Sequence, residues 1–152
     1  RRQEEQNKKN DPSYDPGKVN GATGSMMWPC PSCHTITSPF GWRYHPIYQT
    51  QKYHSGVDIG ASYGATIVAA DGGTIITAGT VSGYGNCVVI NHGNGITTLY
   101  GHMSSIAVRV GQKVSKGQTI GYVGSTGNST GPHLHWEVTV NGVRQNPLNY
   151  AT

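Results

Sequence analysis

Short apolar segments separated by glycine turns recur along most of the chain, which has 22 glycines among its 152 residues. The segment 133–140 ends at Asn141-Gly142, a dipeptide that favours a two-residue hairpin turn, and the chain continues into Val143. Three other pairs of segments flank turn sequences: 66–70 with 74–78, 87–91 with 96–100, and 108–114 with 118–123. Four such hairpins predict eight short strands. We therefore expect an all-β fold, a small antiparallel sandwich or barrel-like domain with little helix.

The N-terminal 25 residues differ in composition from the rest of the chain. Residues 1–10 are almost all polar, and residues 11–25 are rich in Pro, Gly, Asn and Ser, as linkers are. We expect a tail and linker over 1–25 and one folded domain over 26–152.

No apolar stretch approaches the roughly 20 residues that span a bilayer. No signal peptide is visible and the chain starts at Arg1, so we expect a fragment or a processed product.

The net charge of +4 is mild and is compatible with an anionic polymer as a partner. The basic residues after Lys18 are scattered, and no basic run interleaves with aromatic residues. Nucleic acid is therefore not expected as a partner.

Two of the three cysteines, Cys30 and Cys33, form a Cys-Pro-Ser-Cys sequence that is followed by His34. This matches the pattern of c-type haem attachment, but no axial Met or haem-cradling helix is evident. A tight disulfide in an exported protein is the favoured interpretation, and a pair of thiols is the alternative. Cys87 lies in an apolar run and is expected to be a small buried hydrophobe.

Histidines and carboxylates are spaced so that they can bind a metal. His133 and His135 lie one residue apart on an expected strand and therefore point to the same face, which Glu137 shares. His54 and Asp58, four residues apart with a glycine between them, can converge on one point. Two imidazoles and one carboxylate form the protein half of a catalytic zinc site, whose fourth position stays open for water.

Few carboxylates are available as ligands, because only three acidic residues follow Asp15. Asp71 lies in an Asp-Gly-Gly sequence that is typical of a plain turn. Glu137 can be a ligand or a partner that holds an imidazole. Asp58, beside His54, is the better ligand candidate on spacing.

Four sequence features occur in the order found in one known family. These are His-x-x-x-Asp at 54–58, an isolated histidine in Leu-Tyr-Gly-His-Met at 99–103, His-x-His at 133–135, and the flanking sequences at 38–47 and 121–132. Over about 28–150 the chain resembles the lysostaphin-type, or LytM-like, zinc endopeptidases. The resemblance implies a small antiparallel β fold of the duplicated hybrid motif type with its site in a groove at one end. It also implies hydrolysis of peptide bonds in peptidoglycan cross-links or stem peptides.

The resemblance assigns roles to single residues. His54, Asp58 and His135 would bind one Zn²⁺ ion, and a water activated by the metal would attack the scissile carbonyl. His102 and His133 would be the non-ligand catalytic histidines. Because no His-Glu-x-x-His sequence occurs, histidine is the natural proton carrier, since its ordinary pKa is about 6.5.

Three residues near the first motif are further candidates for contact with the substrate. Tyr48 is the candidate for stabilising an oxyanion through its hydroxyl, and His45 and Arg43 are candidates for lining the groove. The run Trp-Arg-Tyr-His-Pro at 42–46 resembles family members that cut directly linked stem peptides more than those that cut glycine bridges.

We expect bacterial peptidoglycan as the partner and an extracytoplasmic location. We also expect a monomer, and any contact with a membrane would be made only through an N-terminal region absent from this chain.

Other functions have weaker support. A regulator that binds the cell wall or activates other wall hydrolases typically lacks zinc ligands, whereas this chain keeps all five site residues. The segment 110–121 resembles the hairpin of biotinyl and lipoyl domains, but it offers no convincing counterpart of their modified lysine. A purely structural zinc site usually fills four protein positions, commonly with cysteine.

The histidines outside these motifs include His34 and His92, which are interpreted as surface or satisfied core residues, with His92 solvated in a hairpin turn.

A separate hypothesis concerns the N-terminal tail. Its linker could fold back so that an asparagine such as Asn20 occupies the open zinc position, which would make a latent form.

Overall fold

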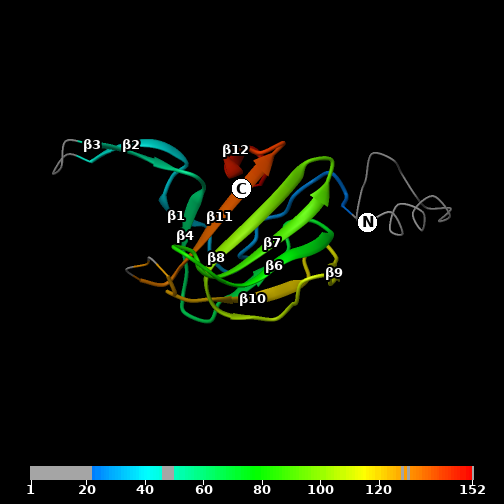
Figure 1. The fold of residues 1–152 in the computed structure, drawn as a ribbon. Coiled ribbons are helices and arrows are strands. Elements are labelled where there is room, and N and C mark those ends of the chain that lie inside the picture. Colours follow the sequence, from blue (N-terminus) through cyan, green and yellow to red (C-terminus); the bar gives the residue numbers. More distant parts are fainter. Residues whose placement is uncertain (1–21, 46–49, 128, 130, 152) are drawn as a thin grey trace, which may run out of the picture.

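The computed structural model describes residues 22–45, 50–127, 129 and 131–151, and their regular structure is almost entirely β-strand (Figure 1). The strands are β1 (Thr35–Ser38), β2 (Gly41–His45), β3 (Thr50–His54), β4 (Val57–Gly60), β5 (Thr66–Val68), β6 (Gly73–Val81), β7 (Gly85–Gly93), β8 (Ile96–Ile106), β9 (Lys113–Val114), β10 (Thr119–Val123), β11 (His133–Val140) and β12 (Val143–Gln145). A 3₁₀ turn, Pro147–Asn149, follows β12. Within the described ranges, no helix has the length and apolar character needed to cross a bilayer.

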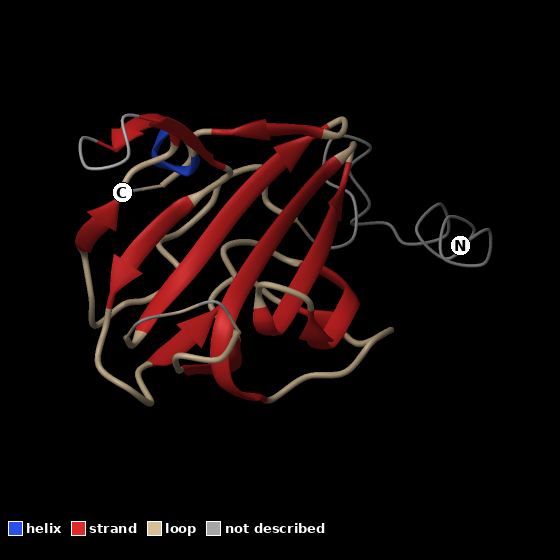
Figure 2. Cartoon of the chain, turned by 60° about the vertical axis from the view of Figure 1, so that its left-hand side comes forward, coloured by secondary structure: helices blue, strands red, loops and turns tan. Residues whose placement is uncertain are grey.

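Ten of the strands form one sheet, and β2 and β3 form a separate two-stranded ribbon. The main path of the sheet runs β1-β4-β11-β8-β7-β6-β9. β8 changes partners along its length: its first part pairs with β11, and its last residues pair with β10, which also pairs with β5. The long strands lie side by side across the molecule (Figure 2). The prediction of an all-β, antiparallel, barrel-like domain is confirmed.

Two of the expected hairpins are confirmed. β7 pairs with β8, and β11 pairs with β12. The turn between β11 and β12 has positive φ angles at both central residues, 50° at Asn141 and 81° at Gly142. These are the angles that a two-residue turn of this kind requires, and Asn and Gly adopt them most easily.

The other two expected hairpins are wrong. β5 pairs with β10, while β6 pairs with β7 and β9. A glycine turn reverses the chain locally, but it does not determine which strand becomes the hydrogen-bonded neighbour. That choice depends on packing between segments that lie far apart in the sequence.

Strand β11 separates the hydrophobic core from the polar cluster described below. Leu134, Trp136 and Val138 are 0% exposed and belong to the core. Trp136 packs edge-on against Trp28, with ring centroids 5.9 Å apart. The alternate positions of β11 carry His133, His135 and Glu137, so the predicted division of this strand into a core face and a polar face is confirmed.

Asp71 is not the plain turn residue that its sequence suggests. Its side chain is buried, and its carboxylate accepts hydrogen bonds of 2.8 to 3.1 Å from the backbone N–H groups of Thr23, Gly24 and Gly72. Ala22 is buried as well. The segment from Ala22 to Gly24 therefore packs against the rest of the described chain.

Replacing Asp71 with alanine should lower the free energy of unfolding by about 1–3 kcal/mol, because partly buried N–H groups lose their acceptor. Chemical denaturation of the purified protein measures this difference. Lys116→Ala, at an exposed turn position, is the control and should change the free energy by less than about 0.5 kcal/mol. Equal stability of the Asp71 variant and the wild type would show that these hydrogen bonds do not anchor the N-terminal segment.

Candidate metal centre

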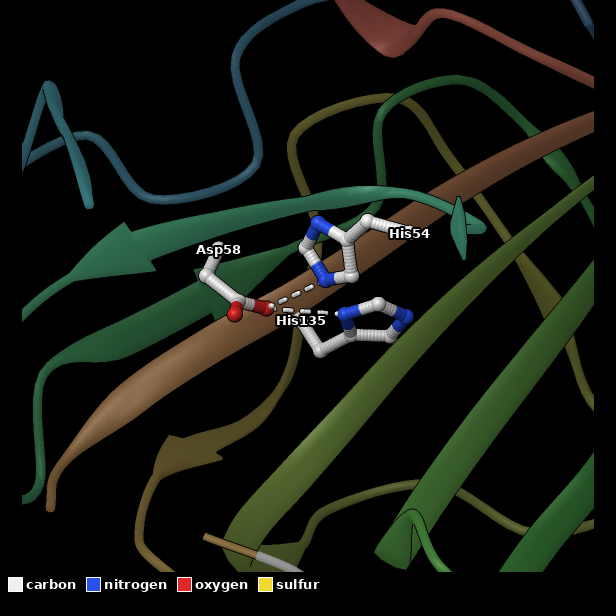
Figure 3. Close-up of side chains that lie close together, drawn as sticks. All are labelled: His54, Asp58 and His135. Carbon is white, nitrogen blue, oxygen red and sulfur yellow. Dashed lines mark hydrogen bonds and ion pairs between the residues drawn. The ribbon is translucent and has the colours of Figure 1, made fainter. Parts of the chain in front are cut away.

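His54, Asp58 and His135 come from three different strands and meet at one point (Figure 3). His54 ends β3, and Asp58 on β4 lies directly opposite His135 on β11 in the antiparallel register. Their potential ligand atoms all lie within 4.8 Å of one another. The three side chains are 13%, 20% and 7% exposed, so the cluster is shielded but still open to solvent.

The rings of the two histidines are oriented by hydrogen-bond acceptors at the nitrogens that face away from Asp58. His54 Nδ1 lies 2.9 Å from the carbonyl oxygen of Pro39, and His135 Nε2 lies 2.8 Å from Glu137 Oε2. A carbonyl or a carboxylate only accepts, so each of these nitrogens carries the N–H. The opposite nitrogens, His54 Nε2 and His135 Nδ1, lie 3.4 and 2.8 Å from Asp58 Oδ1.

This donor set fits a zinc ion. Ligands bound tetrahedrally at about 2.0–2.1 Å lie about 3.3 Å from one another, which is close to the distances seen here between the imidazole nitrogens and Asp58 Oδ1. Two imidazoles and one carboxylate leave a position for a water or a substrate atom, as catalytic zinc sites do. The outer acceptors also hold the imidazoles in the tautomers that a metal requires.

Opposite charges shift the pKa values within the cluster. Burial would raise the pKa of Asp58, but hydrogen bonds from His135 and His54 hold it well below its usual range. Burial would likewise lower the pKa of His135, but its hydrogen bonds to Asp58 and Glu137 raise it to about 9. Without a metal, His135 is therefore an imidazolium at neutral pH, and a bound cation takes the place of its proton.

The metal-free protein should consequently lose stability as the pH rises from about 6.5 to about 9. The folded pKa of His135 lies above its unfolded value, so its contribution is complete below about 6.5 and disappears through about 9. The loss is on the order of 3 kcal/mol. Denaturation of chelator-treated protein at several pH values measures it. A stability that stays constant or rises over this interval would contradict the charged state assigned to His135.

His102 and His133 lie beside the cluster, with their ring centroids 4.7 Å apart. Their Nδ1 atoms lie 2.6 and 2.9 Å from the carbonyl oxygens of Thr126 and Gly131, so the tautomer that these contacts favour has the proton on Nδ1 and the lone pair on Nε2. His133 Nε2 is 3.6 Å from Asp58 Oδ1. Burial lowers the pKa of His102, which keeps its ring neutral and able to accept a proton. The structure thus brings together the five residues predicted as zinc ligands or catalytic histidines.

The backbone of His102 is in the left-handed region, with φ of 60°. Few residues other than glycine adopt this conformation, and it is found where the surroundings require it. The N–H of His102 donates to the carbonyl of Tyr84 at 2.7 Å, and its own carbonyl accepts from Gly124 at 3.0 Å. The hydrogen bonds on both sides fix the direction in which the ring leaves the backbone.

Glu137 is a partner of His135 in this structure, which decides between the two roles that the sequence left open. Its side chain is 1% exposed, and it accepts hydrogen bonds from Ser55, Tyr84 and Arg144 as well as from His135. Sequence reasoning missed the first three of these partners. Only the position of Ser55 next to His54 could have pointed to one of them.

Several other candidates lie outside the cluster or outside the described residues. Tyr48 and Asn20 are not among the described residues, and the side chains of Arg43 and His45 are not described, although their backbone belongs to β2. His92 is buried rather than solvated: its ring nitrogens lie 2.7 Å from the carbonyl of Gly72 and 2.8 Å from the hydroxyl of Thr98.

The expected disulfide is not formed, because Cys30 and Cys33 are free thiols in this structure. They lie across a tight turn in which the N–H of Cys33 donates to the carbonyl of Cys30 at 3.0 Å. His34, which follows them, stacks on Trp28 with ring centroids 5.5 Å apart. Cys87 is buried, as predicted.

Comparison with known proteins agrees with this geometry. The model of the family described as Peptidase family M23 matches residues 52–147, a range that contains all five clustered residues. The chain is 48% identical over 116 residues to the DD-carboxypeptidase/endopeptidase Mpg of Neisseria meningitidis, covering 76% of this chain and 27% of that protein. It is 41% identical over 130 residues to the peptidoglycan DD-endopeptidase ShyA of Vibrio cholerae, covering 85% and 30%.

A third relative has a different name. The murein hydrolase activator EnvC of Escherichia coli is 36% identical over 131 residues, covering 86% of this chain and 30% of that protein. The chain thus spans less than a third of the length of these three relatives.

Two solved structures share the fold. A zinc-containing peptidase from Vibrio cholerae superposes with a TM-score of 0.75 at 35% identity, covering 80% of this chain and 38% of that chain. The antimicrobial peptidase lysostaphin from Staphylococcus simulans superposes with a TM-score of 0.71 at 32% identity, covering 85% and 53%.

Proposed function

The chain belongs to peptidase family M23, and we propose that it is a zinc-dependent endopeptidase that hydrolyses peptide bonds in peptidoglycan. The cluster of four histidines and one aspartate carries this proposal. Three of these residues supply a metal-binding donor set, and the other two supply imidazoles beside it whose Nδ1 atoms face backbone carbonyls. The names of the relatives and of the zinc-containing structural neighbour support both the substrate and the metal.

Hydrolysis of a peptide bond needs an electrophilic carbonyl, a deprotonated water and a proton for the leaving amine. If His54, Asp58 and His135 bind zinc, the metal would act as a Lewis acid that polarises the carbonyl and lowers the pKa of a bound water. The lone pair on Nε2 of His133 or His102 can accept the proton of the attacking water. The same nitrogen can then return that proton to the leaving amine. The second histidine lies beside the first and can orient the reacting groups or donate a hydrogen bond to the oxyanion.

The bond proposed as the substrate joins two D-amino acids in a cross-link between stem peptides. Two of the relatives are named as enzymes of DD bonds. The run at 42–46 resembles members that cut directly linked stem peptides, which points in the same direction. Because this substrate lies outside the cytoplasmic membrane, the proposal includes an extracytoplasmic location.

Mass spectrometry of fragments released from purified peptidoglycan tests the proposal. The protein should release fragments whose new termini lie at D,D cross-links, and a zinc chelator should stop the release. Peptidoglycans with glycine bridges and with direct cross-links should be compared in parallel, since release from the directly linked polymer alone is expected. Release that continues in the presence of the chelator would exclude zinc-dependent hydrolysis.

One observation favours a second candidate function. The similarity to a murein hydrolase activator makes a regulatory protein the alternative, one that binds the wall or activates other hydrolases. The complete donor set and the pair of histidines beside it argue for catalysis by this chain itself. A protein that binds zinc but releases no fragment alone, and that increases release by an added wall amidase, would support the alternative.

A further inference from the structure

The Glu137 carboxylate lies at the centre of a buried hydrogen-bond network behind the metal cluster. Its Oε2 atom is 2.6 Å from Ser55 Oγ, 2.7 Å from the hydroxyl of Tyr84 and 2.8 Å from His135 Nε2. Its Oε1 atom accepts from Arg144 Nε at 3.0 Å. Four donors to its two oxygens oppose the cost of burying this charge and fix the carboxylate in place against His135.

Tyr84 also contacts the second half of the site. It precedes β7, and its backbone carbonyl accepts the 2.7 Å hydrogen bond from the N–H of His102. Its ring lies beside His135, with centroids 5.5 Å apart. One residue thus contacts a candidate metal ligand through its side chain and a candidate proton carrier through its main chain.

The two residues after Tyr84 contact Thr126, the residue whose carbonyl accepts from the His102 ring. The N–H of Asn86 donates to Thr126 Oγ1 at 3.0 Å, and Thr126 Oγ1 donates to the carbonyl of Met103 at 2.7 Å. A Cβ atom on Gly85 would lie 2.4 Å from Thr126, so the two segments are in direct contact. The carbonyl of Thr126 is the group that accepts from His102 Nδ1.

From these contacts we propose that Tyr84 and Thr126 are positioning residues that set the metal ligand His135 and the proton carrier His102 in one fixed relation. Tyr84 acts on His135 through its hydroxyl and Glu137. Thr126 acts on His102 through its carbonyl, which accepts from His102 Nδ1, while the hydrogen bonds of its hydroxyl with Asn86 and Met103 hold the residue in place. This role rests on the function proposed above, because it assumes that His135 binds zinc and that His102 transfers protons.

The hydroxyl of Tyr84 can be tested apart from the rest of the residue. Tyr84→Phe keeps the backbone carbonyl and the ring beside His135 but removes the donor to Glu137. Zinc affinity, measured by competition with a chromogenic chelator, should fall about tenfold, which is the effect of losing a charge-assisted hydrogen bond. Tyr63→Phe is the matched control, since Tyr63 is 70% exposed. The zinc affinity of this variant should equal that of the wild type.

The route through Glu137 gives a second expectation. In a Glu137→Gln background, Tyr84→Phe should weaken zinc binding much less than it does in the wild type, because the two changes affect the same contact. If Tyr84→Phe weakened zinc binding equally in the two backgrounds, the claim that Tyr84 acts through Glu137 would be wrong. An unchanged zinc affinity in Tyr84→Phe alone would overturn the role of its hydroxyl.

Thr126 should affect turnover rather than metal binding. Thr126→Val removes the hydroxyl that bonds Asn86 and Met103, so kcat should fall about tenfold or more while zinc affinity stays unchanged. Thr126→Ser keeps the hydroxyl and should restore most of the rate. A valine variant with wild-type kcat, or a serine variant as slow as the valine variant, would overturn the role of Thr126.

These readouts separate the two proposals. If the wild type hydrolyses no peptidoglycan and Tyr84→Phe still weakens zinc binding, the proposed function fails and the role of Tyr84 in holding the metal ligand stands. If the wild type is active and Tyr84→Phe binds zinc as tightly as the wild type does, the proposed function stands and the positioning role of Tyr84 fails.

Discussion

Replacing His54 with alanine should lower kcat/KM by about 10³-fold or more and prevent stoichiometric zinc binding. His54 supplies one of three protein donors, and a metal that polarises a carbonyl contributes several kcal/mol to stabilisation of the transition state. Each 1.36 kcal/mol corresponds to about a factor of ten in rate. Metal analysis of the dialysed variant and the rate of peptide release from purified peptidoglycan measure both effects.

His34→Ala is the matched control for this variant. His34 is exposed and stacks on Trp28, and within the described residues no hydrogen bond or ion pair joins it to the cluster. Its replacement should leave zinc content and kcat/KM near the wild-type values. A His54 variant that retains one zinc per chain and full activity would show that the metal, if it is needed, binds elsewhere.

Replacing His133 or His102 should give a different result: a large loss of kcat with zinc still bound. The expected decrease is about 10²- to 10⁴-fold, which is the usual contribution of a positioned acid or base. His133→Ala is suitable for the first residue. His102→Asn is better for the second, because its φ of 60° is a conformation that asparagine tolerates and alanine does not.

Zinc stoichiometry distinguishes these variants from the ligand variants. One zinc per chain together with a low kcat is the expected outcome for both residues. Loss of the metal from either variant would make that histidine a ligand rather than a proton carrier. A kcat close to the wild-type value would remove it from the chemistry altogether.

Much of the site could be predicted because its signals are local. The alternation of β11 puts His133, His135 and Glu137 on one face, and the structure has them there. The spacing of His54 and Asp58 lets a short turn between β3 and β4 bring them together. Strand periodicity and a four-residue spacing depend only on neighbouring residues, so a single sequence is enough to show them.

The remaining parts could not be predicted, because their partners are distant in the sequence. Asp71 bonds to Thr23, 48 residues away, and Tyr84 bonds to Glu137, 53 residues away. Such contacts arise only when the sheet brings the segments together, and no local pattern encodes them. The same reason explains the two wrong hairpins, since the pairing of β5 with β10 is a long-range choice.

His92 shows how composition can mislead. It occupies a polar, glycine-rich turn sequence, and this suggested a solvated side chain. In the structure its ring is 4% exposed and is bonded at both nitrogens by groups from the same end of the sheet. Burial lowers the pKa of His92, so the ring remains neutral there. A buried histidine with both nitrogens paired is a structural residue and needs no catalytic role.

The most direct test of the account is a zinc titration of the metal-free protein, with release of peptide from purified peptidoglycan followed at each step. Activity should rise in proportion to added zinc and stop rising at one zinc per chain, since the described residues form one group of three metal donors. His54→Ala should show no such endpoint. Full activity before any zinc is added, or one tightly bound zinc per chain with no hydrolysis of any peptidoglycan, would contradict the account.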